Sequence, residues 1–209
     1  MSREPNDNRQ WLDWGAAGQP LAGETESGDA YLVKFSPGGA LLVVVDGLGH
    51  GPEAAIAARA AISALDEYSG ETIVRLVERC HQKIRSTRGV VLSAAWIEPG
   101  DGHLTWLGVG DVDGLLVRAD AHARPHRECL LARGGVVGYQ LPPLRSSRLP
   151  LHCGDTLILN TDGIRSGFDT GLNLQAPPRQ IADDILASHR RGTDDALVLV
   201  ATYTRRGDD

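Results

Sequence analysis

The chain has 209 residues, of which 42% are hydrophobic and 23% charged, as is ordinary for one globular domain of roughly 100–250 residues. Its 21 Lys and Arg against 27 Asp and Glu give a formal net charge of -6, and no basic run is long enough to follow a nucleic-acid backbone, so we expect no nucleic-acid partner. The longest apolar run, Ala40 to Val45, is far shorter than the roughly 20 residues of a membrane span, and the N-terminus has no apolar signal core. We therefore expect a cytoplasmic protein with no membrane partner.

The cysteines indicate the redox compartment of the protein, and the absence of linkers indicates how many domains it has. Cys80, Cys129 and Cys153 are odd in number and widely spaced, which predicts buried thiols of a reducing compartment rather than a disulfide framework. The sequence contains no internal repeat, low-complexity tract or charge block. We predict a single domain over residues 1–209, with residues 1–10 as a flexible leader and 205–209 as a tail, and we expect a monomer.

The first half of the chain predicts three short strands followed by two helices. The third strand is an unbroken apolar run that suits a strand buried on both faces, and it ends at Asp46. Pro52 fits the first turn of the helix that follows. The predicted strands are Trp11–Ala17, Ala30–Phe35 and Ala40–Val45, and the predicted helices are Glu53–Tyr68 and Glu71–Arg85.

Beyond Gly89, short apolar runs alternate with turn signals, and Asp101-Gly102 is a strong hairpin turn, so an antiparallel meander is expected. Strands and helices do not alternate as in a parallel doubly wound sheet. An α+β fold with helices laid over a mostly antiparallel sheet or sandwich fits better. The predicted strands here are Val90–Ile97, His103–Val109, Leu115–Arg118, Thr156–Asn160 and Ala196–Tyr203, with one helix over Pro178–Arg190.

Acidic residues stand at the ends of several predicted strands, beside glycine or small polar residues. Gathering carboxylates costs desolvation and repulsion unless a cation or hydrogen bonds offset it. Mg²⁺ and Mn²⁺ prefer carboxylate, carbonyl and water oxygens, and one carboxylate can bridge two ions. Asp46, followed by a Gly47 whose bare backbone can approach an ion, is the best candidate for a bridge. The acids are Asp29 in SGDAYLV, Asp46 in VVVDGLGHG, Asp162 in LNTDGI, and Asp194-Asp195 in GTDDALVLV.

The competing interpretation of these acids is structural. Asp-Gly is a common turn dipeptide, and Asp46, Asp101, Asp113 and Asp162 all precede glycine. We assign Asp101-Gly102 and Asp113-Gly114 to turns. For the others, the ordered set of acids at strand ends favours a metal site over isolated turns.

The glycines after Asp46 do not fit nucleotide-binding loops. The dinucleotide fingerprint needs its third glycine where Pro52 stands, and the phosphate-loop pattern needs a Gly-Lys-Ser/Thr ending that the sequence lacks. We therefore expect Gly47, Gly49 and Gly51 to let the backbone approach a metal or a substrate phosphate.

Five segments together carry a resemblance to a known family. GETESGD, VVVDGLGHGPEAA, GVGDVDG, NTDGI and GTDDALVLV, in this order over residues 11 to 203, resemble the metal-dependent serine/threonine phosphatases of the PP2C (PPM) superfamily, SpoIIE-type branch. Within that branch, the length and the stretch IVRLVERCHQKIRSTRG are most similar to the stressosome phosphatases. The resemblance implies a four-layer α-β-β-α fold, an antiparallel β-sandwich flanked by helices, with two Mn²⁺ or Mg²⁺ ions at one end.

The resemblance also assigns ligands to the two ions. Asp46 becomes the ligand that bridges both ions, and the Gly47 carbonyl a ligand of the first. Asp29 holds the first ion directly or through water, and Asp162 holds the second together with one member of the acidic pair.

Other positions are left with two interpretations. Motif alignment favours Asp194 over Asp195 as the remaining ligand of the second ion. Asp111 matches a third, weaker ion site of some relatives, and a turn acid explains it equally well. His50, with Gly49, could contact the substrate phosphate or protonate the leaving group, or else shape the loop.

The implied reaction is hydrolysis of phosphoserine or phosphothreonine on regulatory proteins, by resemblance the phosphorylated STAS-domain proteins of a stressosome. A water activated by the two ions attacks phosphorus, with Asp46 and Asp162 acting through the metals and without a side-chain nucleophile. The segment Glu24–Asp29 lacks an arginine, so phosphate recognition is expected to rest on the ions and selectivity on protein docking. The alternatives are an inactive PP2C-fold binding module, against which the intact set of acids argues, and a metal-dependent phosphoesterase for small molecules.

Overall fold

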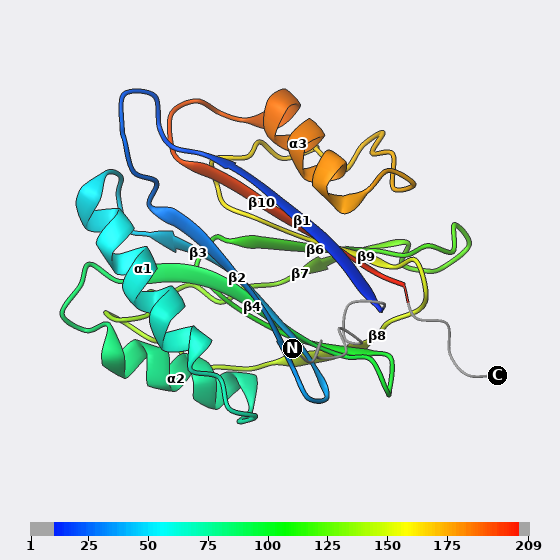
Figure 1. Ribbon diagram of the computed structural model, residues 1–209, viewed down its shortest axis with the longest axis horizontal. Coiled ribbons are helices and arrows are strands. Elements are labelled where there is room, and N and C mark those ends of the chain that lie inside the picture. The colour runs from blue at the N-terminus through cyan, green and yellow to red at the C-terminus, as the bar shows by residue number, and fades with distance from the viewer. Residues whose placement is uncertain (1–10, 205–209) are drawn as a thin grey trace, which may run out of the picture.

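Two five-stranded antiparallel sheets pack face to face, with helices on both outer surfaces (Figure 1). The computed structural model describes residues 11–204, so the predicted leader and tail lie outside the described residues. One sheet has the order β1 (Leu12–Gln19), β10 (Ala196–Tyr203), β9 (Thr156–Asn160), β6 (Asp113–Val117) and β7 (Arg127–Leu130). The other has the order β2 (Asp29–Ser36), β3 (Gly39–Gly47), β4 (Val90–Glu98), β5 (His103–Val109) and β8 (Ser147–Pro150). The helices are α1 (Pro52–Asp66), α2 (Ile73–Lys83) and α3 (Pro178–His189).

The interior strand β3 shows how the layers are held together. Its apolar run is buried on both faces, as predicted. Leu42 and Val44 pack into the core between the sheets, whereas Leu41, Val43 and Val45 pack against α1 and α2. A further apolar cluster lies between α3 and the sheet that contains β10. The order of layers is α-β-β-α, which confirms the predicted fold class.

The helices differ little from the predicted ranges. Pro52 is the first residue of α1, and the buried face of this helix consists almost entirely of alanine. Such small side chains let the helix approach the sheet closely. The second helix begins later than predicted because the Thr72 side chain caps it, accepting a hydrogen bond from the Arg75 N–H at 3.4 Å.

The structure corrects three of the expectations from sequence. The edge strands β7 and β8 were not predicted; they have four residues each and little apolar pattern. Asp113-Gly114 is no turn, because both residues belong to β6 and Asp113 pairs with Asn160. Of the three cysteines only Cys80 is buried, whereas Cys129 and Cys153 are exposed, so burial does not explain the latter two.

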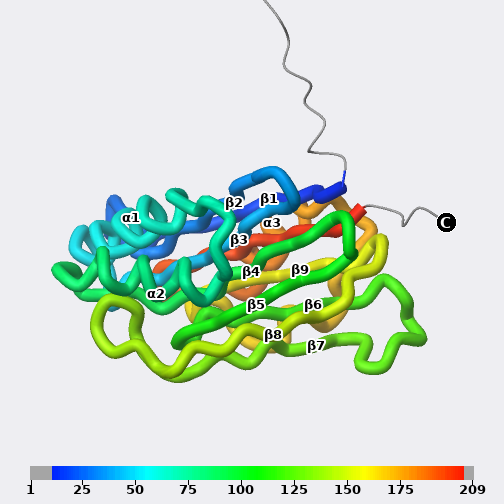
Figure 2. The backbone as a smooth tube through the Cα atoms, turned by 90° about the horizontal axis from the view of Figure 1, so that it is seen from below, coloured from blue at the N-terminus to red at the C-terminus, as the bar shows by residue number. Residues whose placement is uncertain are grey.

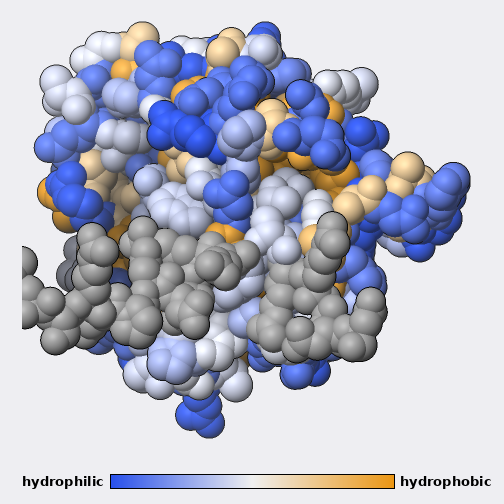
Figure 3. All heavy atoms as spheres, turned by 45° about the vertical axis from the view of Figure 1, so that its right-hand side comes forward, coloured by the Kyte–Doolittle hydropathy of each residue, from blue (hydrophilic) through white to orange (hydrophobic). Residues whose placement is uncertain are grey.

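The first and last described residues lie side by side, since the Thr204 N–H donates to the Trp11 carbonyl at 2.9 Å (Figure 2). On the face drawn in Figure 3, hydrophilic side chains dominate and hydrophobic ones show in small separate areas. Among the described helices, none combines the length and the hydropathy needed to cross a membrane.

Candidate metal centre

Acidic residues from both sheets meet at one end of the sandwich. Asp29 is the first residue of β2 and pairs directly with Asp46 of β3. Asp162 follows β9, and Asp194 precedes β10, in the opposite sheet. Thr161 joins the two sides, because its hydroxyl donates to Asp29 Oδ2 at 2.7 Å. The two sheets are thus coupled at this end by a side-chain hydrogen bond next to the acids.

Asp46 lies in the most unfavourable electrostatic environment of the cluster. The pKa of its carboxyl is raised from 3.8 to about 9, and burial is the largest cause. The negative charges of Asp29 and Asp162 contribute next to this rise, and those of Asp194 and Asp111 contribute in the same direction. Within residues 11–204, the Asp46 carboxylate has no hydrogen-bond or ion-pair partner to offset this cost. A cation at this position would remove it.

The neighbouring acids have the same problem. Burial raises the pKa of Asp29 to about 8, even though the hydrogen bond from Thr161 favours the charged form. Burial also raises the pKa of Asp162, and the charge of Asp111 adds to this, whereas Arg191 lowers it. Asp111 therefore acts electrostatically on both Asp46 and Asp162.

The described side chains alone do not enclose an ion. Within residues 11–204, no three or more His, Cys, Asp or Glu side chains form a group that could hold a metal. Mg²⁺ is commonly bound through one or two carboxylates and keeps several waters, so an all-protein cage is not what such an ion requires. The donor set, carboxylates with a nearby backbone carbonyl, fits hard divalent cations.

Asp194 and Asp195 have clearly different surroundings. Asp195 is 3% exposed, and its two carboxylate oxygens accept from the backbone N–H groups of Leu21 at 2.7 Å and Gly28 at 2.6 Å. This carboxylate fixes the loop between β1 and β2. The side chain of Asp194 is half-buried and accepts only from the Asp195 N–H, at 2.9 Å. Asp194 is accordingly the member of the pair with coordination capacity left.

The glycines beside the acids have a packing role that the sequence did not reveal. A Cβ at Gly47 would lie 2.2 Å from the carbonyl oxygen of Ala54, and one at Gly163 would lie 1.8 Å from the carbonyl oxygen of Asp195. Close backbone contact alone thus requires glycine at both positions.

His50 and Gly49 lie in the loop between β3 and α1. The exposed His50 ring has its Nδ1 3.1 Å from Glu24 Oε1. Gly49 has a φ of +86°, and the guanidinium of Arg88, which is ion-paired with Glu53, lies beside it. Sequence reasoning identified His50 and Gly49 but missed Arg88, which is distant in sequence.

Two polar residues next to Asp162 were also missed. The Thr161 hydroxyl accepts from the Leu197 N–H at 2.9 Å while donating to Asp29. Asn160 is 1% exposed, and its Oδ1 has no hydrogen-bond partner within residues 11–204. Both stand in the motif LNTDGI, but their roles depend on how the two sheets face each other, which the motif does not reveal.

This four-layer sandwich with acids at one end has the fold of the PP2C-type phosphatases. Residues 36–204 match the family described as Stage II sporulation protein E (SpoIIE). The chain belongs to that family.

Individual relatives agree with this. A solved chain from work on the bacterial stressosome as a modular system adapted to control secondary messenger signalling is 31% identical, with a TM-score of 0.83 over 91% of this chain and 98% of that one. The crystal structure of RsbX in complex with magnesium is 19% identical and shares the fold, with a TM-score of 0.82 over 96% of this chain and 98% of that one. The phosphoserine phosphatase RsbX of Bacillus subtilis is 29% identical over 94 residues, 45% of this chain and 47% of the relative. The aligned stretch thus spans about half the length of that curated relative.

Proposed function

We propose that this chain is a metal-dependent protein phosphatase that hydrolyses phosphoserine or phosphothreonine on regulatory partner proteins. The observation that carries the proposal is the gathering of Asp29, Asp46, Asp162 and Asp194 from two sheets, where burial and mutual repulsion raise the pKa of Asp29, Asp46 and Asp162. Such a cluster is costly unless cations occupy it. Membership of the SpoIIE family and the likeness to RsbX support the same activity.

In the proposed centre each acid has its own part. Asp46 would be the ligand shared by two Mn²⁺ or Mg²⁺ ions, with Asp29 and the Gly47 carbonyl as further ligands of the first and Asp162 and Asp194 as further ligands of the second. Bound there, such ions supply activation of water for attack on phosphorus and neutralise the phosphoryl oxygens. Thr161 orients Asp29 through its 2.7 Å hydrogen bond. Outer hydrogen bonds of this kind fix a ligand in its coordinating position.

The loop after β3 is the proposed contact for the substrate phosphate. Glu24 engages Nδ1 of His50 at 3.1 Å. We assign Nε2, the other ring nitrogen, to the leaving alkoxide, which needs a proton as the P–O bond breaks. Gly49 lets the phosphate approach the backbone of this loop. Asp111 is assigned to a third, weaker ion site.

Phosphorylated STAS-domain proteins of a stressosome are the proposed substrates. The 31% identical chain from the stressosome work supports this class of partner. A cytoplasmic monomer without nucleic-acid or membrane partners, folded as one domain, completes the proposal; the free thiols of Cys80, Cys129 and Cys153 are compatible with a reducing compartment.

The test is release of inorganic phosphate from a phosphorylated STAS-domain protein, with and without Mn²⁺, by the wild type and by Asp46→Asn. We expect activity that depends on Mn²⁺ and falls by at least about 100-fold in the variant, since the bridging charge affects both ions. Asp184→Asn, at an exposed position of α3, is the matched control and keeps full activity.

Two alternative functions have distinct outcomes in this assay. A binding module would release no phosphate from any substrate at any Mn²⁺ concentration. A small-molecule phosphoesterase would hydrolyse p-nitrophenyl phosphate with a kcat/KM comparable to that for the phosphoprotein. We expect the phosphoprotein to be strongly preferred.

A further inference from the structure

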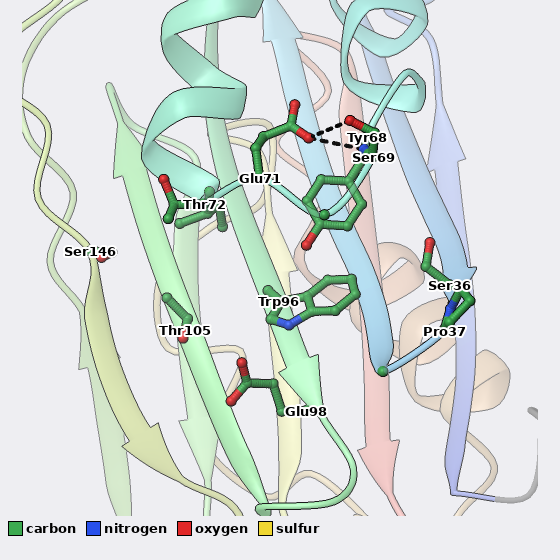
Figure 4. A pocket seen from close by; sticks show the side chains of 13 residues that line it. Ser36, Pro37, Tyr68, Ser69, Glu71, Thr72, Trp96, Glu98, Thr105 and Ser146 are labelled. Atoms are coloured by element: carbon green, nitrogen blue, oxygen red, sulfur yellow. Dashed lines mark hydrogen bonds between the residues drawn. The ribbon is translucent and has the colours of Figure 1, made fainter.

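A cavity of about 700 Å³ lies beneath the connection between α1 and α2, on the outer face of the sheet that contains β4 (Figure 4). It is far from the acids. The cavity reaches the turn after Ser36, at one end of β2, whereas Asp29 lies at the other end of this strand. At about 3.3 Å per residue, the two ends are about 23 Å apart. The cavity lies within the usual size range of small-molecule sites. It is lined by Ser36, Pro37, Gly38, Tyr68, Ser69, Gly70, Glu71, Thr72, Ile73, Trp96, Glu98, Thr105 and Ser146.

Two aromatic rings meet in this cavity. The centroids of Tyr68 and Trp96 are 4.9 Å apart, with a tilt of 43° between the ring planes. Figure 4 shows the Tyr68 ring above the Trp96 indole, which belongs to β4. Because α1 ends at Asp66 and α2 starts at Ile73, neither helix covers this part of the sheet. Both rings are only partly buried.

The charges that line the cavity are negative. Glu71 and Glu98 belong to the lining, and among residues 11–204 no Lys, Arg or His does. Their cationic partners do not line the cavity: Arg79 contacts Glu71 at 2.7 Å, and Arg148 contacts Glu98 at 3.0 Å. The Glu71 carboxylate is fully engaged, because its Oε2 also accepts from the Ser69 N–H at 2.9 Å and from the Ser69 hydroxyl at 3.0 Å (Figure 4). Arg148 contacts only Oε2 of Glu98, and Oε1 has no hydrogen-bond partner within residues 11–204. An incoming cation therefore meets the free oxygen of Glu98.

The Tyr68 phenol lies close enough to these carboxylates for its pKa to be affected by them. Burial raises the pKa of its phenol, and the negative charges of Glu71 and Glu98 raise it further. Its hydroxyl, like those of Ser36 and Thr105, has no hydrogen-bond partner within residues 11–204. These groups leave donors and acceptors available to a ligand that carries its own polar groups.

We infer that this cavity is a binding site for a small organic cation, an amine or quaternary ammonium compound with a hydroxyl or second amine. The positive head stacks against Tyr68 and Trp96 and faces the carboxylate of Glu98. An aromatic face combined with negative charge attracts such heads and disfavours anions. The inference is independent of the proposed phosphatase activity, because it uses no residue of the acidic end.

The test compares choline with 3,3-dimethylbutan-1-ol, which has the same shape but no charge. Titration calorimetry should give choline a dissociation constant at least about tenfold lower, equivalent to about 1.4 kcal/mol. In nitrogen-15 NMR spectra, choline should shift the indole N–H signal of Trp96 and leave that of the buried Trp106 unchanged.

Two variants and a control decide between a specific site and general attraction. Glu98→Gln should weaken choline binding about five- to tenfold and leave the binding of the alcohol unchanged. Tyr68→Leu should weaken it comparably, and Asp184→Asn, on α3 over the other sheet, should have no effect. Equal affinity for choline and the alcohol, no choline binding by the wild type, or a Trp96 signal that does not move would overturn the inference. If Tyr68→Leu fails to fold, Glu98→Gln, at a half-buried rim position, decides alone.

Discussion

Replacing Asp46 by asparagine tests whether this carboxylate is a metal ligand or only stabilises the end of β3, because the two roles predict opposite effects on stability. Without metal, burial and the neighbouring carboxylates destabilise the charged form of Asp46 and raise its pKa from 3.8 to about 9. Asparagine has nearly the same shape and no charge. The variant should therefore be more stable than the wild type when metal is removed.

The raised pKa of Asp46 determines how its contribution to folding stability changes with pH. Since the pKa of Asp46 is higher in the folded than in the unfolded chain, the folded state is favoured at low pH and loses this advantage as pH rises from 3.8 towards about 9. Each pKa unit corresponds to about 1.4 kcal/mol, and relaxation of the site and entry of water absorb much of the full shift. We expect Asp46→Asn to raise the free energy of unfolding at pH 8 by about 1–3 kcal/mol.

The assay is thermal and urea unfolding in EDTA at pH 5 and pH 8, repeated with Mn²⁺. For a domain of this size, the expected gain at pH 8 corresponds to a Tm increase of roughly 3–10 °C, with a much smaller gain at pH 5. With saturating Mn²⁺ the order should reverse, because only the wild type gains binding energy. Asp184→Asn should follow the wild type throughout. A variant less stable than the wild type in EDTA at pH 8 would show that the carboxylate stabilises the fold without metal, and would contradict its role as a metal ligand.

Three further substitutions separate other roles in the site. Asp194→Asn should weaken Mn²⁺ binding at least about tenfold, with little loss of stability in the absence of metal. Asp195→Asn should instead lower the free energy of unfolding, measured with urea, by about 1–3 kcal/mol. The reverse pattern would exchange the roles of the two residues. His50→Gln should lower kcat about tenfold or more for a phosphoserine protein but hardly for p-nitrophenyl phosphate, whose leaving group departs without a proton; equal losses on both substrates would remove His50 as the acid. Gly47→Ala should lower the free energy of unfolding by at least about 2 kcal/mol, because its Cβ would meet the Ala54 carbonyl; an unchanged urea midpoint would contradict this.

The candidate acids could be predicted from the sequence because each follows or begins a short apolar run that is typical of a strand. The apolar run before Asp46 and the short strand before Asp162 fix where each carboxylate leaves its sheet. The sequence could not show that Asp29 and Asp46 are direct cross-strand partners, since register depends on the whole ladder. It likewise gave no sign that Asp195 would be occupied by two backbone N–H groups from the β1–β2 loop.

The features that could not be predicted from the sequence have weak local patterns or depend on residues far apart in the chain. The edge strands β7 and β8 have four residues each, too short for alternation to emerge. The role of Gly47 in bringing the backbone to an ion stays a prediction, and its close contact with Ala54 of α1 is a second reason for glycine that the sequence did not reveal. The pairing of Tyr68 with Trp96 depends on the path of the α1–α2 connection, which no local pattern encodes.

We propose that Asp46 joins two divalent ions at this end of the sandwich, and a crystal grown with Mn²⁺ tests this claim. Anomalous difference maps at the manganese edge should contain two peaks about 3.5–4 Å apart, one on each side of the Asp46 carboxylate. Maps without a peak near Asp46 at saturating Mn²⁺, or with Asp46 turned away from a single ion, would contradict the claim.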